Sequence, residues 1–100
     1  MIEYDKLSEG ADAEIEVTVL AVVEADDGVP IVLAKLDGGQ VELWSANPYV
    51  SDAARSLLRG THVKARITKC PSVISDRSYG GLRKSRERIR FSRLLALRPA

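Results

Sequence analysis

The chain has 100 residues, a 45% apolar composition and a formal net charge of +1, which indicate one folded domain with one core and exclude a disordered chain. No apolar run approaches ~18 residues and the first ten residues are acidic, so we expect neither a membrane span nor a secretory signal, and a cytoplasmic protein. One cysteine, Cys70, and one histidine, His62, exclude an intrachain disulfide and argue against a zinc centre, and we expect no cofactor.

The two halves of the sequence carry opposite charge. Residues 1–50 hold two lysines and eleven acidic residues, a net charge of −9, whereas residues 51–100 hold thirteen basic and three acidic residues, a net charge of +10. This asymmetry is compatible with a basic surface for nucleic acid, with pairing of the two halves on folding, or with head-to-tail association.

Residues 1–12 are interpreted as a polar lead-in to a single domain over residues 13–98, although Tyr4 and Leu7 could attach to its body. From residue 13 to residue 25 the sequence shows its longest strand pattern. The second face of this strand is charged early and apolar late, as expected for a long, bent strand shared by two sides of a small barrel. The first face carries Ile15, Val17, Val19, Ala21 and Val23, and the late half of the strand is expected to be buried on both faces.

Two further strands are predicted to follow through short turns. Asp26-Asp27-Gly28 is the first turn, and Pro30 leads into a strand over residues 31–36. Asp37-Gly38-Gly39 is the second turn and has the glycines that a tight hairpin requires, before a strand over residues 40–44. These three strands form a meander.

A short helix is predicted next, after the turn residues Asn47 and Pro48. Ser51 is the expected N-cap and Gly60 the expected stop. Leu57 and Leu58 are the only large apolar residues that we assign to this helix, so it cannot build a core alone and must fill a gap in a sheet.

A fourth strand covers residues 62–68 and stops at Pro71. Residues 71–87 lack sustained periodicity and indicate a long loop or an extended hairpin. A fifth strand follows, in which Ile89 and Phe91 are expected to face inward between arginine and serine residues, with a bulge or bend before Leu94.

Five strands with one helix between the third and fourth predict an all-β domain with one short helix, a five-stranded Greek-key OB-fold barrel. The run from Gly39 to Trp44, the helix, and the run from Leu58 to Val63 resemble the pattern of single-strand-binding OB domains of the replication protein A type. The resemblance implies a single-stranded nucleic-acid ligand lying across the second and third strands, between the first turn and the loop that joins the last two strands. An SH3-like or other small barrel is the alternative with the same strand count.

Basic residues gather in that loop and in the strand after it. Arginine side chains follow a phosphate backbone and aromatic side chains stack on bases, at ~1–3 kcal/mol per base. We therefore expect binding of single-stranded DNA or RNA with little sequence preference, against the repulsion of the first-turn carboxylates. The candidate binding residues are Trp44, Arg77, Tyr79, Arg83, Lys84, Arg86, Arg88 and Arg90.

Plainer interpretations exist for the same residues. Alternation places Trp44 on the outer face, where it either stacks on a base or is covered by the helix or the loop. Tyr79 is better explained as a loop anchor, and the loop arginines could form a solvated surface. On the fourth strand, Lys64 and Arg66 are expected to pair with Glu14 and Glu16 across neighbouring strands.

Catalysis is not expected. The sequence has no glycine-rich phosphate loop with a lysine and no serine in a nucleophile-elbow context. The second hypothesis for function is an OB-fold protein-interaction or self-assembly module with no nucleic-acid ligand, whose acidic and basic halves meet complementary surfaces on a protein partner or on another copy of the chain.

Overall fold

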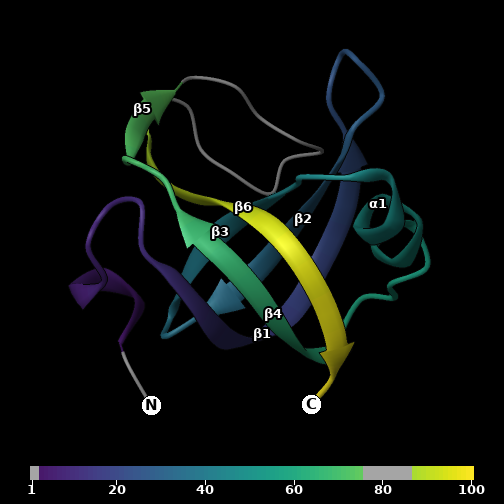
Figure 1. Cartoon of the computed structure of the whole chain (residues 1–100), viewed down its shortest axis with the longest axis horizontal. Coiled ribbons are helices and arrows are strands. Elements are labelled where there is room, and N and C mark those ends of the chain that lie inside the picture. Colours follow the sequence, from purple (N-terminus) through teal and green to yellow (C-terminus); the bar gives the residue numbers. More distant parts are fainter. Residues whose placement is uncertain (1–2, 76–86) are drawn as a thin grey trace.

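The computed structural model describes residues 3–75 and 87–100, with the backbone alone for residues 73–75 and 87–89. A 3-10 helix, η1 (Tyr4–Lys6), precedes the strands, and the α-helix α1 (Pro48–Arg55) lies between the third and fourth strands (Figure 1). The strands are β1 (Asp12–Glu24), β2 (Pro30–Leu36), β3 (Gly39–Ser45), β4 (His62–Lys69), β5 (Val73–Ser75) and β6 (Glu87–Pro99).

Five of these strands close into a barrel. β1 pairs antiparallel with both β2 and β4, β2 pairs antiparallel with β3, and β4 pairs antiparallel with β6. The barrel closes because β3 and β6 also pair, in parallel. This strand order, with one helix between β3 and β4, confirms the predicted five-stranded Greek-key OB-fold barrel. The short strand β5 is an addition that pairs only with the beginning of β6.

The predicted meander of β1, β2 and β3 is present. Leu36 pairs with Gly39, which leaves Asp37 and Gly38 as a two-residue turn. The φ angles of these two residues, 50° and 79°, are both positive, as the favoured two-residue hairpin turn requires.

A bulge in β1 changes which side chains face the core. The register against β2 shifts between Val19 and Ala21, so Leu20 is an extra residue. The first half of β1 pairs with β4 and the second half with β2, which confirms the strand shared by two sides. Beyond the bulge, Val22 packs against the core, and Ala21, Val22 and Val23 are all partly buried, so both faces of this half of the strand are shielded in part.

The inward residues of β6 differ by one position from the prediction. Ser92 and Leu94 are both fully buried, whereas Phe91 is only partly buried. Arg90 shares the inward side with Ser92, because alternate residues of a strand lie on one face. The side chain of Ile89, also expected inward, lies outside the described residues, and the register shift against β4 follows Leu94 instead of preceding it.

The helix starts and ends elsewhere than predicted. Asn47 is its N-cap, and the side-chain Oδ1 of Asn47 accepts a hydrogen bond from the backbone N–H of Val50 at 3.0 Å. Ser51 lies inside the helix, because an asparagine followed by proline at the first helical position is itself a complete start signal. The last helical residue is Arg55, and Gly60, with φ 87°, belongs to the turn before β4.

Helix α1 and the N-terminal segment lie on opposite sides of the barrel (Figure 1). Val50 and Ala54 are the buried residues of α1, and Leu57 packs against the same core, but Leu58 is 75% exposed. From the N-terminal segment, Tyr4 enters the core and is 1% exposed. The segment before β1 therefore contributes one of the largest buried side chains of the protein.

Tyr4 is held by polar groups from β4 and β6. The hydroxyl of Tyr4 shares a hydrogen bond with the hydroxyl of Ser92 at 2.8 Å and donates to the carbonyl of Phe91 at 3.1 Å. The ammonium of Lys69 lies 5.0 Å from the centre of the Tyr4 ring and donates to the Tyr4 carbonyl at 3.0 Å. Burial raises the pKa of the Tyr4 phenol. We call Tyr4, Lys69, Arg90 and Ser92 the Tyr4 cluster.

Arg90 is the second cation of the Tyr4 cluster that lies over the ring. Its guanidinium carbon lies 5.5 Å from the centre of the Tyr4 ring. The guanidinium donates to the carbonyls of Leu36 at 2.8 Å and Gln40 at 3.1 Å and pairs with Asp5 at 3.3 Å. A Cβ at Gly39 would lie 2.7 Å from this guanidinium, so the side chain of Arg90 occupies the space that glycine leaves free.

We expect Tyr4→Phe to lower the free energy of unfolding by about 1–2 kcal/mol, because it removes a phenol that serves two hydrogen bonds and leaves the buried Ser92 hydroxyl without this partner. Chemical denaturation followed by far-ultraviolet circular dichroism measures the change. Tyr49→Phe is the matched control, since Tyr49 is 89% exposed. Equal unfolding midpoints for the two variants would contradict the role assigned to the phenol.

Candidate nucleic-acid interface

The outer face of β2, β3 and β6 is built from residues that oppose one another across the strands. Residues directly opposite in paired strands share a face, so the registers of the two pairs define rows of side chains across the barrel. The first row contains Ile31, Trp44 and Arg93, and the second contains Leu33, Glu42 and Phe91.

Access to this outer face increases from β2 towards β6. Ile31 and Leu33 of β2 are 0% and 2% exposed, and Glu42 of β3 is 4% exposed. Trp44 is partly exposed and Arg93 is exposed. Within these two rows, the part that another molecule can reach is therefore the end of β3 and the neighbouring part of β6.

Trp44 lies on the outer face, as alternation predicts, because Leu43 before it is fully buried in the core. The indole Nε1 donates a hydrogen bond to the carboxylate of Glu42 at 3.1 Å. This bond restrains the ring at its Nε1 edge, and the side chain as a whole is partly exposed.

The structure describes the side chains of two of the eight predicted binding residues. Trp44 is on the outer face, but Arg90 lies on the inward side, where the Tyr4 cluster holds it. Arg90 is a structural residue, and we do not keep it in the interface. The side chain of Arg88 and the whole of Arg77, Tyr79, Arg83, Lys84 and Arg86 lie outside the described residues.

Arg93 is the outer-face cation that the sequence reasoning missed. It occupies the position in β6 opposite Trp44 because the inward side of β6 carries Ser92 and Leu94. Leu94 was the available signal, since an inward Leu94 with no intervening bulge places Phe91 and Arg93 outward. Because Ser92 is polar, the sequence did not indicate that its position faces inward with Leu94.

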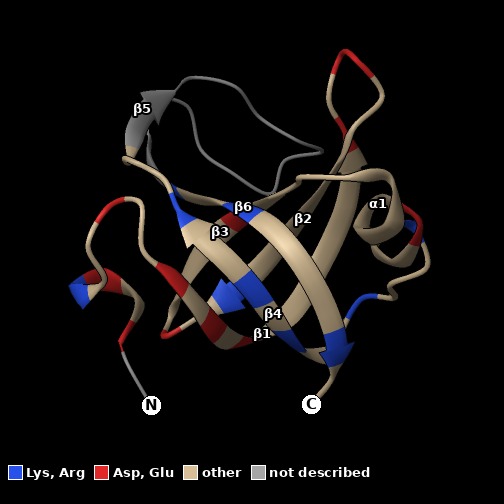
Figure 2. Cartoon of the chain, in the orientation of Figure 1, with Lys and Arg blue, Asp and Glu red and all other residues tan. Residues whose placement is uncertain are grey.

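Acidic residues lie along β1 and basic residues along β4 and β6 (Figure 2). β1 and β4 are neighbours as predicted, with Glu14 opposite Arg66 and Glu16 opposite Lys64, but of the predicted ion pairs only that of Lys64 is formed. Lys64 pairs with Glu16 at 3.8 Å, but Glu14 is bound by Arg98, in two hydrogen bonds of 2.6 and 2.9 Å. The bond from Arg98 lowers the pKa of the Glu14 carboxyl.

Two exposed arginines remain on this side of the barrel. Among the side chains that the structure describes, Arg66 and Arg93 form no ion pair and no hydrogen bond. Arg93 is opposite Thr68, two residues along β4 from Arg66, so both arginines project from the same outer face. We call Arg66 and Arg93 the free arginine pair, and it begins directly beside Trp44.

The acidic first turn is partly compensated. Arg55 of α1 lies 3.8 Å from the carboxylate of Glu24 and donates to the carbonyl of Gly28 at 3.1 Å. Asp27 accepts a hydrogen bond from the backbone of Val29 at 3.1 Å, within the turn. The first turn therefore keeps negative charge near one end of the outer face, although one of its three carboxylates, that of Glu24, has a cationic partner.

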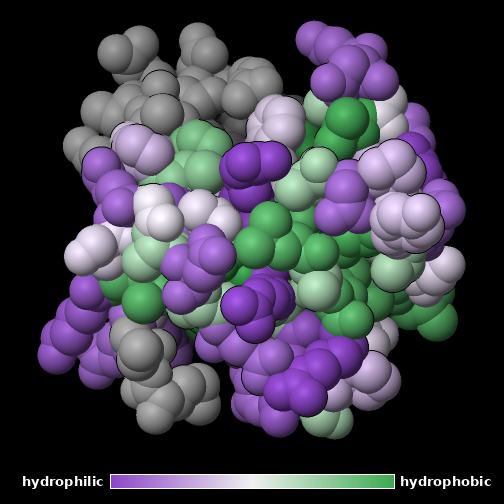
Figure 3. Space-filling model, in the orientation of Figure 1, coloured by the Kyte–Doolittle hydropathy of each residue, from purple (hydrophilic) through white to green (hydrophobic). Residues whose placement is uncertain are grey.

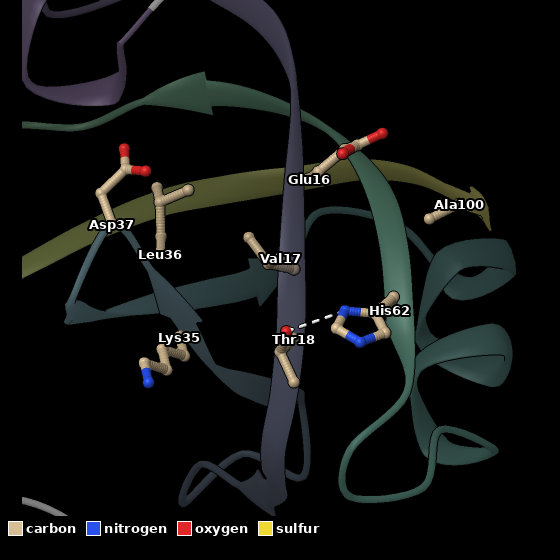
Figure 4. A pocket seen from close by; sticks show the side chains of 8 residues that line it. All are labelled: Glu16, Val17, Thr18, Lys35, Leu36, Asp37, His62 and Ala100. Carbon is tan, nitrogen blue, oxygen red and sulfur yellow. Dashed lines mark hydrogen bonds between the residues drawn. The ribbon is translucent and has the colours of Figure 1, made fainter.

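A separate open hollow lies where β1 passes from β4 to β2 (Figure 4). Thr18 and His62 face each other there, with the threonine hydroxyl 2.9 Å from Nδ1 of the imidazole. Glu16, Lys35 and Asp37 also line it, so charges of both signs alternate around an open surface. This hollow provides no concentrated charge that would select a ligand.

No group of three or more histidine, cysteine, aspartate or glutamate residues that could hold a metal ion occurs in the described part of the chain. Within the same part, no helix has the length and apolar character needed to cross a membrane. No protein-family model matches the chain, and the search of curated proteins also found no match.

The ion pair between Glu14 and Arg98 predicts a specific pH dependence of stability. Because the folded-state pKa of Glu14 lies below its ordinary value of 4.5, the pair stabilises the protein above that value and is lost as the pH falls through the folded-state pKa. We expect Glu14→Gln to lose less stability than the wild type between about pH 5 and pH 3. Denaturation midpoints across this range test it, and parallel curves would contradict it.

Proposed function

We propose that this OB-fold domain binds single-stranded DNA or RNA with little sequence preference, in the manner of replication protein A-type domains. The observation that supports the proposal most directly is the juxtaposition of Trp44 and Arg93 on the accessible part of the outer face. An aromatic ring beside an exposed arginine without an ion pair offers a stacking surface for a base and a cation for the adjacent phosphate.

The chemistry of this face favours general over sequence-specific binding. Stacking on an indole tolerates every base, because each base has a π-face. Two polar groups of this face are not open to base edges, since Glu42 is 4% exposed and the indole N–H of Trp44 is already directed to the Glu42 carboxylate. Further contacts are proposed from the predicted basic residues of the segment between β5 and β6 and its aromatic residue, namely Arg77, Tyr79, Arg83, Lys84, Arg86 and Arg88.

Fluorescence tests the proposal directly, because Trp44 is the only tryptophan in the chain. We expect single-stranded oligonucleotides to quench its emission and to bind with an affinity that falls steeply with salt. Trp44→Leu should weaken binding by about 5- to 150-fold, which corresponds to ~1–3 kcal/mol for a stacked base. Fluorescence anisotropy of labelled DNA and RNA oligonucleotides at two salt concentrations measures these affinities.

Tyr49→Leu is the control for that experiment, since Tyr49 is an exposed aromatic residue on α1 and has no place in the proposed interface. Its affinity should match that of the wild type. Absence of binding to DNA and RNA at low salt would reject the proposed function.

A protein-interaction or self-assembly module is the second candidate function. The observation that favours it is the exposure of Tyr49, at 89%, and of Leu58, at 75%, on and just after α1. Apolar surface also gathers over β6 and towards α1 in the space-filling view (Figure 3). Exposed apolar surface of this kind often marks a protein interface.

If this side mediates self-assembly, the wild type should form a species of defined stoichiometry whose population rises with concentration. Replacing Tyr49 and Leu58 with serine should return it to the monomer, because both side chains are removed from the contact. Sedimentation velocity over a range of protein concentrations measures this. A wild type that stays monomeric throughout would contradict self-assembly through α1.

A further inference from the structure

We infer that a bound single strand runs from Trp44 across β6 to β4, with its phosphates on the free arginine pair, Arg93 and Arg66. The inference rests on the proposed function and concerns the path of the same ligand. It differs from the path over the second and third strands that the family resemblance implies, and three features of the barrel support the difference.

The first feature is the burial of Ile31 and Leu33, two of the three outward residues of β2 that face β3, whereas the third, Lys35, is exposed. A path across β2 and β3 would place bases over the outward side chains of those strands, yet Ile31 and Leu33 are 0% and 2% exposed. A side chain without exposed surface cannot receive a base. Beside Leu33, the outward residue of β3 is Glu42, which is only 4% exposed and so gives a base no more access than its neighbour.

The second feature is the continuity of accessible residues towards β4. Neighbouring strands lie ~4.8 Å apart, so Arg93 is one strand spacing from Trp44, and Thr68 of β4 is one spacing further. Arg66 is two residues along β4 from Thr68, about 7 Å away on the same face. The long arginine side chains can bridge these separations, so one extended strand can contact the indole and both guanidinium groups.

The third feature is the way the neighbouring acids are occupied. Glu14, which lies opposite Arg66, is held by Arg98. Next to it along β1, Glu16 pairs with Lys64 at 3.8 Å, and Asp12 accepts a hydrogen bond from Thr68. The acids of β1 therefore form their hydrogen bonds and ion pairs with other groups, and Arg66 interacts with Glu14 only through its charge, which helps to lower the pKa of that carboxyl.

Salt dependence distinguishes the two paths. Each phosphate contact adds about 0.7 to the slope of log affinity against log salt for a single strand. Arg93→Gln and Arg66→Gln should each reduce this slope by about 0.7, and the double variant by about 1.4, in titrations with a poly-thymidine oligonucleotide. Lys35→Gln is the matched control, because Lys35 is an exposed cation on the outer face of β2 that has no ion pair among the described residues.

An unchanged slope for Lys35→Gln together with reduced slopes for the two arginine variants would support the path across β6 and β4. A reduced slope for Lys35→Gln with unchanged slopes for both arginine variants would overturn this path and leave the proposed function intact. If the wild type does not bind the oligonucleotide even at low salt, the proposed function fails and the path fails with it. Circular dichroism of each variant confirms that the barrel is folded.

Discussion

The parallel pairing of β3 with β6 is the constraint on which the rest of the structure depends, because it closes the sheet into a barrel. A closed barrel gives each strand one inward and one outward face. The side chains that point inward from all the strands must together fill one interior, and this requirement determines which alternate residues of each strand point inward. The bulges in β1 and β6 meet this need where a regular strand would bring the wrong residues inward. Closure also leaves the two sides of the barrel to be covered by other segments, α1 and the N-terminal segment.

The N-terminal segment changes the role of a charged residue. Because Tyr4 is buried beside it, the Arg90 guanidinium lies over the Tyr4 ring and donates hydrogen bonds to two backbone carbonyls. Its guanidinium therefore stabilises the fold and is not directed towards a ligand. Lys69 is used similarly, by the carbonyls of η1 and of Leu7. Part of the positive charge of the C-terminal half is therefore used within the fold, whereas Arg66 and Arg93 are exposed on the outer face and form no ion pair among the described side chains.

The charge asymmetry of the sequence has a structural explanation in part. The acidic first half and the basic second half meet where β1 lies beside β4, and Glu14 and Glu16 bind cations from β6 and β4. These pairs are exposed, so their contribution to stability is small and sensitive to salt. Their larger effect is on function, because they decide which arginines are held by a carboxylate and which are open to a phosphate.

Local signals in the sequence determined the order of strands and helix along the chain, the two turns of the meander and the outward orientation of Trp44. They suffice for these features because alternation and turn residues act within a few neighbouring positions. Only the tertiary structure decided which alternate residues of β6 point inward and that Leu20 is an extra residue in β1. It also decided that Arg90 binds within the fold. Those features depend on residues far apart in the sequence, such as Tyr4 and Ser92, which meet only when the barrel closes. A strand pattern with a single serine among arginines fits either phase, and burial of that serine against a phenol selects one of them.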